Sequence, residues 1–210
     1  IYVWKTGGLI LDGCFVNWKN IKYVDMEMPW WPEKVNDSFS VDGKQYAAVS
    51  DLCVTTLQLT YAFLFNKQLA GEYCKEDLYT VVDEGRWTVD YLYNLSKNVY
   101  SDLNLNGIHD QGDLFGFAGD VVCGADAYLP AFNQPILNNT SNGLEVAINT
   151  SRTVDALEKL YKLYYENDGA YIAPDYWSKY DVFKNGQSLF IQARLITLFD
   201  RLRDMNVDFG

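Results

Sequence analysis

The chain has 210 residues, of which 49% are hydrophobic and 16% aromatic, so it has enough apolar residues to bury a sizeable core. Its 17 basic and 28 acidic residues give a formal net charge of −11. This acidic excess argues against nucleic acid or anionic lipid as a partner and favours neutral, cationic or metallic ligands. No apolar run in the sequence approaches the length of a membrane span.

The four cysteines contain no Cys-x-x-Cys pair and have no histidine close by, so neither a zinc site nor a thioredoxin-type motif is expected. They stand at Cys14, Cys53, Cys74 and Cys123. Two disulfides are one possibility. Burial as four small hydrophobic side chains is the other, and the lack of a short-range cysteine framework favours it. The first residues are Ile1-Tyr2-Val3-Trp4, and this opening predicts a start within a longer protein.

The N-terminal third is expected to change from loops to regular structure. Residues 1–45 are rich in Gly, Trp, Asn and Asp, and Pro29-Trp30-Trp31-Pro32 interrupts any regular element there. The long apolar run from Leu57 to Phe65 predicts a central strand that is buried on both faces. A short helix is predicted for residues 68–73.

A second helix has a readable start at Thr88, whose hydroxyl can cap it. Apolar residues then recur at intervals of three and four, at Val89, Leu92, Leu95 and Val99. This helix is expected to run directly into the loop at 102–113, and Phe115-Gly116-Phe117 is expected to open a strand.

The remaining elements alternate between helix and strand. We predict helices at 125–133, 180–184 and 195–205, and strands at 144–148, 188–191 and 207–209. A longer helix is predicted to begin at a Thr153 cap, with an inward stripe of Val154, Leu157, Leu160, Tyr161 and Tyr164. The alternation indicates an α/β sheet covered on its faces.

The segment 102–113 has the residue spacing of a calcium loop. Oxygen-bearing side chains occupy its first, third, fifth, ninth and twelfth places, and glycine occupies the sixth; hard divalent cations take six to eight such oxygens. The predicted ligands are Asp102, Asn104, Asn106, the backbone carbonyl of Ile108, Asp110 and Asp113. Two departures are His109 at the eighth place and the short Asp113 at the twelfth. The alternative is a surface turn rich in Asn, Asp and Gly, without metal.

Taken in order, short motifs along nearly the whole chain resemble the family 1 extracellular solute-binding proteins of bacterial ABC importers, in their carbohydrate-binding branch. The motifs are Trp30-Trp31, Gly43-Lys44-Gln45-Tyr46, Phe65-Asn66-Lys67, Glu84-Gly85-Arg86-Trp87-Thr88, the 102–113 loop with Phe115-Gly116-Phe117, Val182-Phe183-Lys184-Asn185-Gly186-Gln187-Ser188-Leu189-Phe190, Leu202-Arg203-Asp204-Met205 and Asp208-Phe209-Gly210. Each motif alone is weak, and together they are specific.

The resemblance implies an α/β fold of the periplasmic-binding-protein-like type, a clamp of two lobes joined by crossing strands with the solute between them. Residues 1–49 would belong to the first lobe, 50–56 would form a crossing or hinge segment, and 57–210 would form the second lobe with the calcium loop. The opening part of the first lobe and the return crossing would lie outside this sequence.

The function implied by the resemblance is non-catalytic capture of a sugar or oligosaccharide for delivery to an ABC permease in the membrane. The protein would be an extracellular, lipid-anchored monomer, with no nucleic-acid partner and calcium in a structural role. Ligand contacts carried over by position are Asp51, Thr55, Tyr128, Trp177 and Arg194, with Trp31 as a further stacking candidate.

Two alternatives stay open. A glycoside hydrolase would use paired carboxylates, which are plentiful here, although a single histidine and the lack of a Gly-rich phosphate loop argue against other catalytic sets. A calcium-dependent, dockerin-like adhesion module would carry two loops in a short helical domain, whereas this chain has one loop within an α/β pattern. We therefore expect a binding protein and no enzyme.

Overall fold

The computed structural model describes residues 6–41, 43–140 and 143–210. It divides into two compact units. The first unit holds the chain up to Gln58 together with Leu137–Val146, and the second holds Leu59–Ile136 and Ala147–Gly210. The resemblance assigned residues 57–210 to the second lobe. It did not predict that Leu137–Val146 belong to the first unit.

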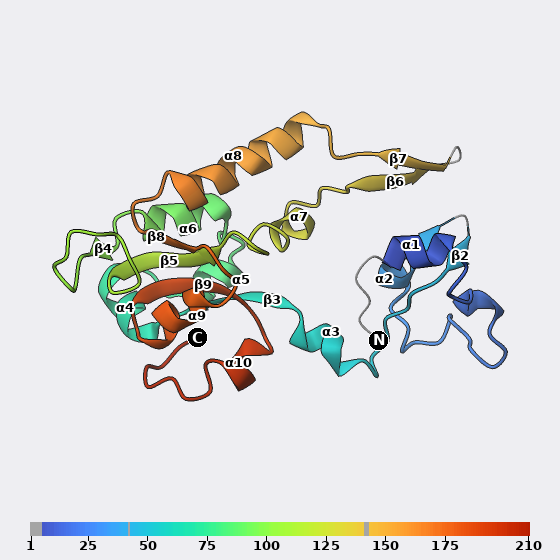
Figure 1. Cartoon of the computed structure of the whole chain (residues 1–210), viewed down its shortest axis with the longest axis horizontal. Helices are drawn as coiled ribbons and strands as arrows, with labels where there is room; N and C mark the ends of the chain where they lie inside the picture. The colour runs from blue at the N-terminus through green and yellow to red at the C-terminus, as the bar shows by residue number, and fades with distance from the viewer. Residues whose placement is uncertain (1–5, 42, 141–142) are drawn as a thin grey trace. The chain divides into compact units, whose positions relative to one another are not determined.

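The second unit is built on a mixed five-stranded sheet (Figure 1). Its strands are β3 (Tyr61–Phe65), β4 (Tyr100–Ser101), β5 (Leu114–Asp120), β8 (Ala170–Ala173) and β9 (Ser188–Arg194). Strands β8 and β9 run parallel to β5, while β4 pairs antiparallel with β5 and β3 antiparallel with β9. The carboxyl ends of β5, β8 and β9 therefore share one edge of the sheet, where β3 begins.

Helices cover both faces of this sheet. They are α4 (Lys67–Tyr73), α5 (Leu78–Asp83), α6 (Val89–Ser96), α7 (Tyr128–Ala131), α8 (Ser151–Tyr165), α9 (Ser178–Lys184) and α10 (Thr197–Asp200). Helices α6 and α8 lie on one face and α9 on the other (Figure 1). None of the helices in the described ranges is both long and apolar enough to cross a membrane.

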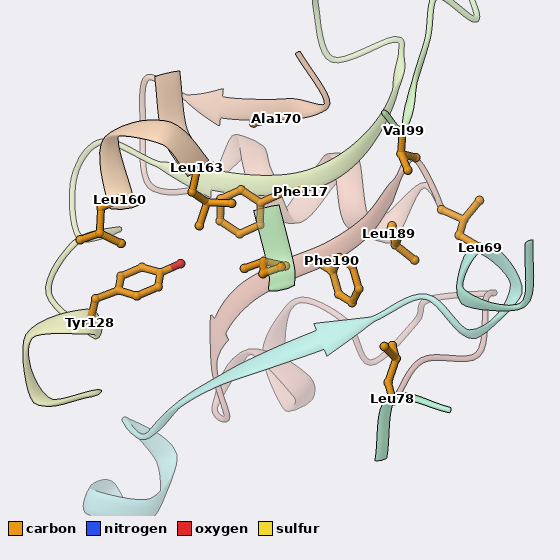
Figure 2. Packing of buried hydrophobic residues seen from close by; sticks show 11 residues of the cluster. Leu69, Leu78, Val99, Phe117, Tyr128, Leu160, Leu163, Ala170, Leu189 and Phe190 are labelled. Atoms are coloured by element: carbon orange, nitrogen blue, oxygen red, sulfur yellow. The ribbon is translucent and has the colours of Figure 1, made fainter. Parts of the chain in front are cut away.

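The core has a cluster on each face because neighbouring strand residues point to opposite sides. Phe117 and Phe190 pack with Leu163 of α8 in the cluster of Figure 2. Ile191 and Ala118 pack instead with Phe183 of α9. This double coverage confirms the predicted α/β class for the second unit.

Two glycines allow α6 to end close to the sheet. A Cβ atom at Gly116 would lie 2.3 Å from the backbone oxygen of Ser96, and one at Gly169 would lie 1.9 Å from the same oxygen. Any larger residue would push the end of α6 away from β5. The Thr88 cap is confirmed, since its hydroxyl accepts a hydrogen bond from the Tyr91 N–H at 3.1 Å.

The predicted central strand from Leu57 to Phe65 is wrong in extent and position. Residues Val54–Gln58 form helix α3, and Leu57 is 68% exposed. The strand begins at Tyr61 and pairs with β9 alone among the named strands, so within the described chain it lies at the edge of the sheet. Hydrophobicity alone does not separate a short helix from a strand in an apolar run.

Other predicted helices have different bounds. The longer helix α8 is capped by Thr150 instead of Thr153, and its buried residues are Thr153, Ala156, Leu160 and Leu163. Helix α7 has four residues of the predicted 125–133, and α10 has four of the predicted 195–205. The predicted strand at 207–209 is one isolated bridge between Asn66 and Phe209. Strands β4 and β8 were not predicted.

The first unit consists of short elements. They are α1 (Thr6–Leu11), η1 (Trp18–Asn20), α2 (Glu33–Ser38), β1 (Ser40–Val41), β2 (Lys44–Gln45), α3, β6 (Leu137–Thr140) and β7 (Gly143–Val146). Asn36 joins α2 to Val49 through its side chain, which donates to the Val49 carbonyl and accepts from the Val49 N–H, both at 2.8 Å. Among the side chains that the structure describes in this unit, the buried ones are polar: Asn36 and Gln45.

All four cysteines are free, two of them exposed and two half-buried. The favoured expectation of four buried cysteines is therefore wrong, and no disulfide takes its place.

Candidate functional site

The edge of the second unit where β5, β8 and β9 end is the strongest candidate for a binding site. In open α/β sheets, ligands bind outside the carboxyl ends of the parallel strands. Asp120 ends β5, Arg194 ends β9, and Tyr61, the first residue of β3, pairs directly with Arg194. The α9 region adds Tyr176, Trp177 and Lys179. We call Tyr61, Asp120, Tyr176, Trp177, Lys179 and Arg194 the strand-end cluster.

A buried ion pair supports this cluster from below. Lys179 Nζ lies 2.6 Å from Asp120 Oδ2, and both side chains are almost fully buried. Lys179 also donates to the Gln192 carbonyl at 2.8 Å, while Asp120 Oδ1 accepts the N–H groups of Val122 and Cys123. Burial lowers the pKa of Lys179, and its contact with Asp120 opposes that effect. The pair ties α9 to the ends of β5 and β9.

Arg194 lies between two tyrosine rings. Its Nη2 donates to the Tyr61 hydroxyl at 2.8 Å, and the guanidinium carbon lies 5.0 Å from the Tyr61 ring centroid and 5.8 Å from that of Tyr176. Burial raises the pKa of the Tyr61 hydroxyl, and the hydrogen bond from Arg194 acts in the opposite direction. These contacts fix the direction of the arginine fork at the end of β9.

Trp177 supplies the exposed aromatic surface of the cluster. It is 49% exposed, packs edge-on against Tyr176 with ring centroids 4.7 Å apart, and has the Arg201 guanidinium 4.2 Å from its ring centroid. Asp175 Oδ1 accepts the Trp177 N–H at 2.6 Å, which fixes the backbone beneath the ring. Flat aromatic rings of this kind stack on the apolar faces of sugars.

The structure thus brings two of the predicted contacts, Trp177 and Arg194, into one cluster through Tyr176. Tyr128 is placed elsewhere: it is 3% exposed and lies in the core beside Leu160 and Leu163 (Figure 2). Burial raises the pKa of its hydroxyl well above the usual value. We correct the prediction for Tyr128, because a side chain enclosed in this way has no surface for a solute.

The other predicted contacts belong to the first unit. Asp51 and Thr55 are exposed, Asp51 in a turn and Thr55 within α3 instead of a crossing strand. Trp31 packs edge-on against Trp18 with centroids 5.8 Å apart and lines a cavity of about 800 Å³ in this unit, together with Asp25, Glu27 and other residues. The roles of Asp51, Thr55 and Trp31 as ligand contacts stay predictions.

Sequence reasoning missed Tyr61, Asp120, Tyr176 and Lys179. Asp120 and Tyr61 stand at strand ends, and the rule for carboxyl ends of parallel strands could have selected Asp120 once β5 was predicted. The carboxylate of Asp120 is engaged by Lys179 and two backbone N–H groups. That arrangement suits a structural role better than proton transfer.

The loop at 102–113 folds back on its own side chains. Asp102 Oδ2 accepts the Gly107 N–H at 2.9 Å, Asn104 Oδ1 accepts from Asn106, and Asn106 Oδ1 accepts from Ile108. The backbone is left-handed at Gly107, with φ 71°, and also at Leu105, with φ 56°. That conformation is sterically unfavourable for leucine, which has a Cβ atom. The chain therefore winds around the segment's own oxygen atoms.

The acidic residues of this loop leave oxygen atoms without partners. Asp102 Oδ1 and Asp113 Oδ1 are buried and accept no hydrogen bond from any described residue, and the Asp113 side chain as a whole is buried. Asp110 receives the side-chain amides of Asn104 and Asn106 at 3.1 and 2.8 Å. The bond from Asn106, followed by the Gly112 N–H, lowers the pKa of Asp110.

His109, at the eighth place of the loop, has a structural position. Its ring stacks on Tyr100 with centroids 4.9 Å apart and meets Phe115 edge-on at 4.8 Å. Its Nε2 lies 3.2 Å from the Asp168 carbonyl oxygen. The histidine ring therefore packs the loop against Tyr100 of β4 and Phe115 of β5.

Comparison with known proteins identifies the fold. No protein-family model and no curated protein matches the sequence. Among solved structures, an ABC substrate-binding protein of Listeria monocytogenes in complex with cycloalternan matches with a TM-score of 0.55 and 18% identity, over 96% of this chain and 47% of that one. The maltotriose-binding protein of Thermus thermophilus, bound with maltotriose, matches with 0.56 and 18%, over 96% and 47%.

A third match is UgpB of Mycobacterium tuberculosis in complex with glycerophosphocholine, with a TM-score of 0.56 and 15% identity, over 97% of this chain and 46% of that one. The chain spans about half the length of these proteins. The predicted resemblance to solute-binding proteins of ABC importers and the predicted α/β clamp class are thus confirmed in the fold, and this chain has the fold of about half of such a substrate-binding protein.

Proposed function

We propose that the protein containing this chain captures a sugar or oligosaccharide outside the cell membrane and delivers it to an ABC permease without changing it chemically. The observation that carries the proposal is the strand-end cluster, in which Tyr176 contacts both half-exposed Trp177 and Arg194, and Arg194 is hydrogen-bonded to Tyr61. An aromatic face next to a few directed polar groups is the usual composition of a sugar site. The protein would act as a monomer, held at the membrane by a lipid anchor.

The solved structures of similar fold support a binding role but do not choose the solute. Two of them hold oligosaccharides, and the third holds glycerophosphocholine. The choice of carbohydrate rests on Trp177, because a broad aromatic face can cover the apolar face of a pyranose ring. The same face would also attract the quaternary ammonium of glycerophosphocholine, so the test below includes that solute beside the sugars.

Binding measurements on the full-length protein test this proposal. Calorimetry against an oligosaccharide panel and glycerophosphocholine should show binding to at least one sugar. Trp177→Ala should weaken that binding at least about tenfold, or about 1.4 kcal/mol. Tyr161→Ala is the matched control, since Tyr161 is a comparably exposed aromatic on α8. Tighter binding of glycerophosphocholine than of any sugar would reject a carbohydrate solute, and release of reducing ends would favour the glycoside hydrolase.

We also propose that the 102–113 loop binds one calcium ion with a structural role. The residues fit the ion: half-buried Asp102 and buried Asp113 each have one buried oxygen without a hydrogen-bond partner among the described residues, and the backbone is already wound around the loop. No three Asp, Glu, His or Cys side chains converge on a metal position within the described ranges, so the site would rely on Asn104, Asn106 and the Ile108 carbonyl as well. The ion would link the chain after α6 to the start of β5.

A further inference from the structure

We infer that the solute recognised at the strand-end cluster is an acidic sugar, one that carries a carboxylate or sulfate group, and that Arg194 selects it. This inference rests on the proposed function and names the ligand class of the same site. It follows from the charges that the cluster leaves unpaired, from the contacts of Arg194 and from its place at the end of β9.

The charges at this edge of the sheet are unevenly paired. The positive charge of Lys179 is used by Asp120, at 2.6 Å. The Asp175 carboxylate is engaged by the N–H groups of Trp177 and Ser178 and by the Ser178 hydroxyl. Arg194 and Arg201 form no ion pair with any described residue. In a chain with a net charge of −11, these two arginines leave positive charge at this edge that no described carboxylate neutralises.

Arg194 has donor groups to spare. Its Nη2 donates to the Tyr61 hydroxyl, and its Nε is buried without a hydrogen-bond partner among the described residues. A guanidinium has five N–H donors in a rigid fork, whose shape matches the two oxygens of a carboxylate or of a sulfate. Tyr61 and Tyr176 hold this fork in place, so little rotamer entropy is lost when an anion binds.

Neutral sugars interact less favourably than acidic sugars with the Arg194 guanidinium. A sugar hydroxyl that accepts one hydrogen bond leaves the partly buried positive charge of Arg194 uncompensated, whereas an anionic oxygen pair both neutralises it and accepts two bonds. Trp177, whose ring is linked to Arg194 through Tyr176, would stack on the sugar ring. Arg201, whose guanidinium lies 4.2 Å from the Trp177 ring centroid, adds a second positive charge. The cluster thus combines an aromatic platform with an excess of positive charge.

The test is a glycan array with matched neutral, uronic-acid and sulfated oligosaccharides, probed with the full-length protein, followed by calorimetry on the best ligand and its neutral counterpart. We expect the tightest ligands to be acidic and their binding to weaken with salt. Arg194→Gln should reduce binding of the acidic ligand about 10- to 100-fold and reduce binding of the neutral counterpart by a much smaller factor. Arg194→Lys keeps the charge and loses the fork, so its affinity for the acidic ligand should lie between those of the unmodified protein and Arg194→Gln.

The matched control is Arg203→Gln, which removes one positive charge from an exposed arginine after α10 and should leave acidic-sugar binding unchanged. Preference for neutral sugars, or an equal loss for neutral and acidic ligands in Arg194→Gln, would overturn this inference and leave the proposed function standing. Failure to bind any glycan would overturn both. The uronic and sulfated arms show which anionic group is recognised.

Discussion

At the residue scale, the Lys179–Asp120 pair shows how a charged group can be kept inside an α/β unit. The strand end offers a carbonyl from Gln192 and two N–H groups near Asp120, so both charges have further hydrogen bonds besides one another. Such a pair adds little stability compared with an apolar pair of the same size. Its consequence here is positional, since it fixes α9, and with it Tyr176 and Trp177, against the ends of the strands.

We predict that Lys179→Met lowers the free energy of unfolding by about 3 to 5 kcal/mol, because it leaves the Asp120 carboxylate charged and buried. Adding Asp120→Asn to that variant should restore part of the loss. Lys159→Met is the control: it breaks the Lys159–Asp90 pair, whose side chains are both about half exposed, and should cost less than about 1 kcal/mol. Urea unfolding monitored by circular dichroism measures all three, and equal losses in the two lysine variants would contradict the assignment.

At the scale of elements, the sequence predicted where helices and strands begin better than it predicted which side of a helix is buried. The Thr88 cap and the strand after Phe115 are confirmed, since a capping hydroxyl and an apolar β-prone run act over a few residues. Helix α8 shows the opposite. Its buried residues Thr153, Ala156, Leu160 and Leu163 are spaced like the predicted stripe of larger residues, so periodicity alone did not decide which side faces the sheet.

The same limit applies to the candidate site. Arg194 and Trp177 were predicted from the resemblance, but their link through Tyr176 was not. The contact of Arg194 with Tyr61, which precedes it by 133 residues, depends on the pairing of β3 with β9. The prediction that β3 lies at the centre of the sheet was wrong, because the order of strands in a sheet depends on partners far away in the sequence. Tyr128 was misplaced for a related reason, because its burial depends on how α7 packs against α8.

For the 102–113 loop we predict that calcium raises the melting temperature. At a calcium concentration of about one hundred times the dissociation constant, binding adds about 2.7 kcal/mol to stability, or a shift of roughly 5 to 10 °C for a chain of this size. Asp102→Ala should abolish the shift, because it removes an oxygen at the first place of the loop. The measurement is differential scanning calorimetry in calcium and in chelator.

Asp155→Ala is the control for that experiment, since Asp155 is an exposed acid on α8 outside the loop, and it should keep the full calcium response. Identical melting temperatures in calcium and chelator would favour the metal-free surface turn. A response that survives Asp102→Ala would move the ion to another place in the chain.

At the scale of the whole molecule, the two units are stabilised in different ways. The second unit buries large apolar side chains on both faces of its sheet, among them Phe117, Phe190 and Ile191. The first unit relies on the polar contacts of Asn36 and Gln45, and no hydrophobic side chain is buried among its described residues. Burial of apolar area is the main favourable contribution to folding, and hydrogen bonds add only about 0.5 to 1.5 kcal/mol each.

We therefore predict that backbone amides of the first unit open locally, well below the free energy of global unfolding, whereas those of β5 and β9 open only with it. In native-state hydrogen exchange, Phe117 and Ile191 should exchange at least about a hundredfold more slowly than Asn36 and Val49, whose amides are both hydrogen-bonded. Low concentrations of urea supply the internal control. Exchange at Phe117 and Ile191 should accelerate steeply with urea, because global unfolding exposes much surface, while exchange at Asn36 and Val49 should change little. Equal rates with the same urea dependence in both units would show that the chain unfolds as one cooperative body, and that the polar network of Asn36 and Gln45 is as strong as the apolar core.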